Sequence, residues 1–134
     1  MPLVRIDLIK GRPEAEVAAI GAAVQRAMMD CLDVPKRDHF QVITEHARGR
    51  LIYDPDYLEV KRTDGVVMIQ VFLSAGRSTA QKQAFYARAA ELLSKDAKVR
   101  PEDVTITLSE NVRENWSFGN GVAQYVVIPK DQWK

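Results

Sequence analysis

An internal repeat limits the folds that this sequence can adopt more than any other feature. When the 134-residue sequence is shifted against itself by 65 positions, identical residues coincide at both ends of each half. The coinciding pairs are Leu8 and Leu73, Gly11 and Gly76, Arg12 and Arg77, Val34 and Val99, Asp38 and Asp103, and Glu45 and Glu110. Such a repeat indicates that one structural unit occurs twice. We therefore expect one domain over residues 1–134, with halves of about 1–65 and 66–134.

Each half carries the pattern of a strand, a helix and a second strand. Strand patterns alternate apolar with polar residues, and helical stretches repeat apolar residues at spacings of three and four. The expected elements are strands over 2–8, 40–45, 66–73 and 104–108, and helices over about 13–32 and 78–97. In each half the two strands should be parallel and joined by a right-handed helical crossover. The sequence predicts an α/β (α+β) fold: a four-stranded mixed sheet, two helices on one face, and a hairpin in the C-terminal tail.

This architecture leaves the second face of the sheet uncovered. The residues expected there are Leu3, Arg5, Asp7 and Ile9 in the first strand, and Val66, Met68, Gln70 and Phe72 in the third. That surface is too apolar for comfortable exposure to water. We therefore expect a homo-oligomer in which these faces pack together.

The composition excludes several classes of function. The net charge of +1 gives no reason to expect nucleic acid or a membrane surface as a partner, and no stretch approaches the roughly 20 apolar residues of a membrane span. The single cysteine, Cys31, rules out an internal disulfide and fits a reducing compartment. With no signal-peptide pattern, we expect a cytoplasmic protein. His39 and His46 should face opposite sides of an extended stretch, so we expect no metal site.

Pro2 is the first candidate catalytic residue. If Met1 is removed, Pro2 presents a secondary amine, which is a stronger nucleophile than a primary amine. If Met1 stays, the same nitrogen is an amide and is inert. Proline after methionine is also common without any catalytic role, so Pro2 needs support from other residues.

Three features together resemble the tautomerase superfamily. The first is the proline after Met1 that opens a tandem β-α-β domain. The second is the stretch VPKRDHFQ at 34–41, which is similar to the loop that bears a catalytic Asp in that superfamily. The third is NWSFGNG at 115–121, which is similar to the aromatic tail of malonate semialdehyde decarboxylases. The resemblance covers nearly the whole chain and is weakest over residues 46–65.

The resemblance implies a homotrimer that uses Pro2 as a catalytic amine and needs no cofactor. It implies that Asp38 lies beside Pro2 and that Arg77, which opens the second helix, binds a carboxylate. Many of these decarboxylases carry a second arginine two residues earlier, where this chain has Ala75. That difference argues against activities that need two cations, such as hydration of acetylenic acids.

Each candidate also has a purely structural interpretation. Asp38 could simply cap a turn before the strand, and its repeat partner Asp103 could do only that; the glycine-arginine turn could be structural in both halves. We expect Trp116, Phe118 and Tyr125 to form an apolar wall of the substrate site, although such rings also serve as ordinary core or interface residues.

The sequence leaves three functions open. The leading one is cofactor-independent decarboxylation of a small anionic β-keto acid such as malonate semialdehyde, with keto–enol tautomerase activity as a possible side activity. The second is a tautomerase, or a hydratase or dehalogenase of haloacrylates, that uses the same Pro2. The third is a non-catalytic oligomeric protein that binds small molecules and retains Met1.

Overall fold

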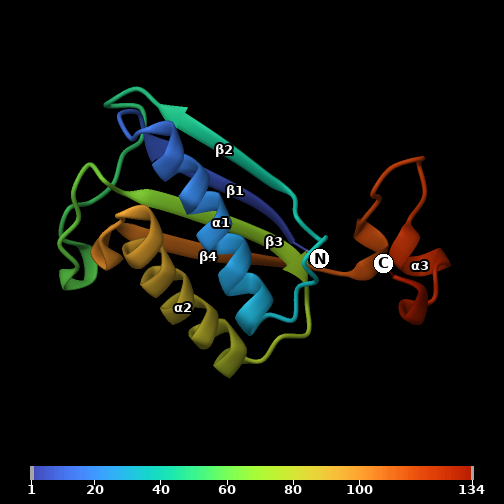
Figure 1. Cartoon of the computed structure of the whole chain (residues 1–134). Coiled ribbons are helices and arrows are strands. Elements are labelled where there is room, and N and C mark those ends of the chain that lie inside the picture. Colours follow the sequence, from blue (N-terminus) through green and yellow to red (C-terminus); the bar gives the residue numbers. More distant parts are fainter. Residues whose placement is uncertain (1, 134) are drawn as a thin grey trace.

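The computed structural model describes residues 2–133, and it contains the two predicted β-α-β units. The elements are β1 (Pro2–Ile9), α1 (Glu14–Cys31), β2 (Gln41–His46), β3 (Val67–Ser74), α2 (Thr79–Ala97) and β4 (Val104–Asn111). The strand order in the sheet is β2-β1-β3-β4. Strands pair in parallel within each unit, and β1 pairs with β3 in antiparallel orientation. Both long helices cover the same face of the sheet (Figure 1), so the predicted α+β fold is confirmed.

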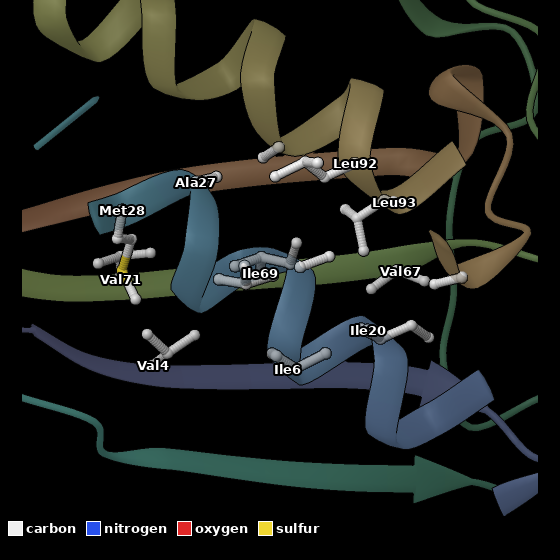
Figure 2. Packing of buried hydrophobic residues seen from close by; sticks show 14 of the residues in the cluster. Val4, Ile6, Ile20, Ala27, Met28, Val67, Ile69, Val71, Leu92 and Leu93 are labelled. Carbon is white, nitrogen blue, oxygen red and sulfur yellow. The ribbon is translucent and has the colours of Figure 1, made fainter. Parts of the chain in front are cut away.

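The core lies between this sheet face and the two helices. Alternate residues of β1 and β3 point into it, and the apolar stripes of α1 and α2 meet them (Figure 2). Fully or almost fully buried side chains include Val4, Ile6, Ile20, Met28, Ile69 and Leu93. Burial of each such side chain contributes about 1.5 to 3 kcal/mol relative to exposure. Within residues 2–133, no helix has the length and hydropathy of a membrane-spanning segment.

The repeat is visible in the backbone as well as in the sequence. Gly11 and Gly76 occupy matching turns between a strand and a helix, with φ angles of 134° and 131°. Residues with a Cβ rarely adopt this conformation, which explains why glycine occurs at both positions.

The uncovered face of the sheet carries most of the residues expected there. Leu3 is 36% exposed, and Met68 and Phe72 are partly buried. Val66 is a correction, because it is only 1% exposed. Strand β3 begins one residue later than predicted, and the backbone N–H of Val66 donates to the carbonyl of Thr63 in the preceding turn.

The tail beyond β4 does not form the predicted hairpin in the part that the structure describes. It contains short 3₁₀ turns and one short helix, α3 (Gln124–Val127), and it projects from the end of the sheet at which β1 begins (Figure 1). The Gln124 side chain explains the difference, because it accepts from the N–H of Phe118 and donates to the carbonyl of Gly119.

Candidate active site

Pro2 begins the strand that runs through the middle of the sheet. Pro2 is buried, and it pairs with Leu73 of β3. On the other side, Val4 is level with Gln41, and its N–H donates to the carbonyl of Phe40 over 3.0 Å. Extending this register by two residues brings Pro2 level with His39, next to Asp38. Met1, on whose removal the chemistry of Pro2 depends, lies outside the described residues.

Asp38 lies in the loop between α1 and β2, and its backbone is held on both sides. Its N–H donates to the carbonyl of Pro35 over 3.0 Å, and its carbonyl accepts from the side-chain amide of Gln25 over 3.1 Å. Burial raises the pKa of the Asp38 carboxyl above its ordinary value, and the positive charge of Arg77 acts in the opposite direction. The Arg77 guanidinium is therefore close enough to act on this carboxyl.

Arg77 precedes α2 and donates hydrogen bonds to both halves of the chain. Its Nε donates to the carbonyl of Leu32 at the end of α1 over 3.1 Å, and its Nη1 donates to the carbonyl of Ser74 over 3.0 Å. Nη2 makes no hydrogen bond within residues 2–133. Arg77 thus has a structural role and keeps donors for a ligand.

The repeat partner Arg12 makes the corresponding structural contacts. Its guanidinium donates to the carbonyl of Gly65 over 2.8 Å and to the carbonyl of Lys98 at the end of α2 over 3.4 Å. Unlike Arg77, it also lies 3.6 Å from the carboxylate of Glu16. The glycine-arginine turn is therefore structural in both halves, as one interpretation of the sequence predicted.

Aromatic rings of the tail form a cluster with Phe40, which follows Asp38 by two residues. Phe118 stacks on Trp116 with centroids 5.6 Å apart, meets Tyr125 edge-on at 5.0 Å, and lies 6.0 Å from Phe40. Trp116 Nε1 also donates to the side-chain oxygen of Asn111 over 2.6 Å. The structure thus brings together the three predicted rings.

Two rings of this cluster were not predicted from the sequence. Phe40 follows Asp38 by two residues, which is a local signal that could have been noticed. Trp133 lies 4.4 Å from Tyr125, measured between ring centroids, but nothing in the sequence near residue 133 points to the site.

Tyr125 links the rings to the charged groups. Burial and then the negative charge of Asp38 raise the pKa of Tyr125 to about 12, while Arg77 and Arg113 act to lower it. The phenol is therefore neutral and can donate a hydrogen bond at physiological pH. Three charged side chains from separate parts of the sequence act on this one hydroxyl.

A pocket of about 530 Å³ opens between the sheet and the tail at this end of the molecule. Ser74, Ala75 and Asn111 line it from the ends of β3 and β4, and Arg113 and Tyr125 line it from the tail. Ser74 directly follows Leu73, the partner of Pro2. Of the six predicted site residues, Tyr125 is among those that line this pocket, and Pro2, Asp38, Arg77, Trp116 and Phe118 are not.

Neither histidine belongs to this site. His46 Nε2 lies 2.6 Å from Asp7 on the uncovered sheet face, and His39 is exposed. Within residues 2–133, no group of three or more histidine, cysteine or acidic side chains could hold a metal ion.

Comparison with known proteins agrees with the fold. Sequence profiles described as tautomerase enzyme match residues 2–61 and 38–119. The chain is 40% identical to the probable tautomerase YusQ of Bacillus subtilis (strain 168), over 94% of this chain and 99% of that protein. Among solved structures, it is similar to FG41 malonate semialdehyde decarboxylase inhibited by 3-bromopropiolate, with 40% identity, a TM-score of 0.88, and coverage of 95% and 99%.

A second malonate semialdehyde decarboxylase, described in wild-type, mutant and inactivated forms, is also similar. It shares 33% identity and a TM-score of 0.88, over 92% of this chain and 95% of that one. The two family profiles together match residues 2–119, and the curated relative and the two decarboxylase structures each cover more than 90% of this chain. This chain belongs to the tautomerase superfamily, and it is an enzyme of that family whose structure is similar to malonate semialdehyde decarboxylase.

Proposed function

We propose that this enzyme decarboxylates a small β-keto acid, with malonate semialdehyde as the leading candidate, through the secondary amine of Pro2. The observation that carries the proposal is the meeting of Asp38, Arg77 and a neutral Tyr125 at the end of the sheet where Pro2 begins β1. A cation for the carboxylate and an amine for the carbonyl are the two groups that an anionic keto acid needs.

Pro2 provides the electron sink. Once Met1 is removed, the protonated amine either donates to the carbonyl oxygen of the substrate or condenses with the carbonyl to give an iminium. The bond between the α-carbon and the carboxylate then breaks, its electron pair forms an enol or enamine, and carbon dioxide leaves. In the hydrogen-bonded route Pro2 gives its proton to the enol oxygen. Water then protonates the α-carbon, the enol O–H returns its proton to Pro2 as the carbonyl re-forms, and hydroxide is left in solution.

Asp38 keeps that amine protonated. Its carboxylate would accept a charge-assisted hydrogen bond from the ammonium of Pro2. Burial, which raises the pKa of Asp38, is offset by each positive charge nearby, so a Pro2 ammonium and the Asp38 carboxylate stabilise one another.

Arg77 and the rings act on the carboxylate that is lost. Nη2 of Arg77 is available to bind it, but binding alone does not lower the barrier, because acceleration requires the transition state to be favoured over the ground state. The rings of Trp116, Phe118 and Tyr125 form an apolar surface that disfavours the localised charge and tolerates neutral carbon dioxide.

Two relatives support a small carboxylate as the substrate. One malonate semialdehyde decarboxylase is described with decarboxylase and hydratase activities, and the FG41 enzyme is described as inhibited by 3-bromopropiolate, a three-carbon acid. Both are at least 33% identical to this chain over nearly its full length.

Release of carbon dioxide from malonate semialdehyde tests the proposal. We expect Pro2→Ala to lower turnover by about 10²-fold or more, because a weaker primary amine replaces the secondary amine. Unchanged turnover in Pro2→Ala, with the wild-type enzyme active, would remove Pro2 from the mechanism.

A tautomerase proper is the second candidate. The relative named probable tautomerase and the FG41 decarboxylase have the same 40% identity to this chain, so sequence distance favours neither. A neutral Pro2 would act as a general base in keto–enol tautomerisation, whereas a protonated Pro2 suits decarboxylation. An NMR titration in which the Pro2 amine loses its proton well below neutrality would favour the tautomerase.

We also propose that the functional form is a homotrimer joined through the uncovered sheet face. The partly buried Met68 and Phe72 and the exposed Leu3 give that face an apolar surface. Membership in an enzyme family favours both catalytic functions over a non-catalytic binding protein.

A further inference from the structure

Ala75 lies two residues before Arg77 and lines the pocket at the end of β3. A small side chain at this position leaves room in the pocket. Arg113, in the tail, lines the same pocket and carries a guanidinium group. The tail therefore contributes a cation to the pocket that Ala75 leaves open.

Arg113 is held in place by aromatic rings. The central carbon of its guanidinium lies 5.4 Å from the ring centroid of Trp133, and that ring lies 4.4 Å from the ring of Tyr125. A cation over the face of an indole is attracted by the ring and gives up none of its N–H donors in doing so. Arg113 makes no ion pair with any residue in 2–133, so its donors are available to a ligand.

The electrostatics of Tyr125 support the same arrangement. Arg77 and Arg113 both act to lower the pKa of Tyr125, although burial and Asp38 raise it overall. Two guanidinium groups, one before α2 and one after β4, therefore lie near a single hydroxyl.

We infer that Arg113 is a second carboxylate-binding cation of this site and that it contacts small anionic acids from the tail, in the pocket that Ala75 also lines. This inference rests on the proposed function, because it assigns a residue of the substrate site. Binding through Arg113 stabilises the substrate carboxylate before and during reaction, so its loss should raise KM more than it lowers kcat. Glu114, the acidic residue of the lining, opposes anion binding and should weaken it.

Calorimetric titration with malonate, an unreactive three-carbon diacid, tests the inference without turnover. We expect Arg113→Ala and Arg113→Gln to weaken malonate binding by about tenfold, and Arg113→Lys to weaken it by about threefold. Arg113→Gln retains contact area on Trp133, so it covers the case in which the alanine variant does not fold. The matched control is Lys130→Ala, an exposed cation of the same tail outside the pocket lining, which should bind malonate like the wild type.

Relocating the charge gives the sharper test. Adding Ala75→Arg to Arg113→Ala should restore most of the malonate affinity, because both positions line the same pocket. Glu114→Gln should tighten binding. Malonate binding by Arg113→Ala and Arg113→Gln that equals that of Lys130→Ala would overturn the inference, as would folded Ala75→Arg/Arg113→Ala protein with no recovery. A failure of the Pro2 mechanism would show up in carbon dioxide release and leave these titrations unchanged.

Discussion

At the scale of single residues, the two halves of the repeat carry aspartates in matching positions but in different surroundings. Asp103 is only 1% exposed, and its carboxylate accepts from the backbone N–H and the hydroxyl of Thr63, each over 2.7 Å. Asp38 is half-buried beside the candidate site, and burial raises its pKa. The sequence could predict that both positions matter, but it could not predict which carboxylate is closed off by the chain.

This difference predicts opposite effects of the same substitution. Because the pKa of Asp38 is higher in the folded protein than in the unfolded chain, Asp38 costs stability as pH rises from about 4 through its raised pKa. Asp38→Asn should therefore gain stability relative to the wild type between pH 4 and pH 7. Its turnover should fall by roughly 10- to 100-fold, the equivalent of a charge-assisted hydrogen bond of about 1.5 to 3 kcal/mol.

The matched control is Asp103→Asn. The amide keeps one acceptor oxygen and replaces the other with an NH2 donor, so one of the two Thr63 donors loses its partner, which should lower the free energy of unfolding by about 1 to 3 kcal/mol, with turnover retained. Denaturant unfolding at both pH values measures these effects. A less stable Asp38→Asn at pH 7 would contradict the assigned direction of the Asp38 pKa.

At the scale of elements, periodic segments were predictable and segments held by side chains were not. The strands and long helices follow the alternating and helical patterns, and their ends differ from the prediction by up to three residues. The prediction of a hairpin in the tail was wrong, because no pattern in the sequence reveals the two hydrogen bonds that the Gln124 side chain makes.

The segment over residues 46–65 acquires a role only in three dimensions. It brings Thr63 to Asp103, and it brings the carbonyl of Gly65 to Arg12. A Cβ at Gly65 would lie 3.0 Å from an oxygen of Asp103, so glycine permits this close approach. Residues 46–65 thus supply the contacts that surround Asp103 in the second half. The corresponding place in the first half, beside Asp38, is the candidate site.

Arg12 and Arg77 occupy matching positions in the repeat, and a comparison of their variants distinguishes a structural role from a functional one. Each donates to a carbonyl at the end of the other half's helix, so Arg12→Ala and Arg77→Ala should each lower the free energy of unfolding by about 1 to 2 kcal/mol. Arg77→Ala should also lower turnover by about 10²-fold through loss of a carboxylate contact. Steady-state kinetics and thermal unfolding of both variants measure the two effects; equal turnover in them would make Arg77 structural only.

At the scale of the whole molecule, the sheet has one face covered by helices and one that is not (Figure 1). The sequence predicted this imbalance from the placement of apolar residues in β1 and β3, and the alternating burial of both strands agrees. The arrangement of copies around that face could not be derived from one chain, because no pattern in a single sequence fixes the contacts between chains.

Light scattering should therefore give a trimer at micromolar concentration. Phe72→Asp, on the uncovered face, should shift the protein toward monomer, because a carboxylate would lose its hydration in the interface. Ile52→Asp is the control, since Ile52 is 84% exposed in the segment before β3 and should leave the mass unchanged. A wild-type monomer would contradict the proposed assembly.

The account as a whole depends on a free secondary amine at Pro2, and the intact mass of the protein expressed in its natural host tests this most directly. We expect a mass that lacks Met1, because only then is the Pro2 nitrogen an amine that can be protonated or attack a carbonyl. A mass that includes Met1 would leave that nitrogen an amide and would contradict every mechanism that begins at Pro2.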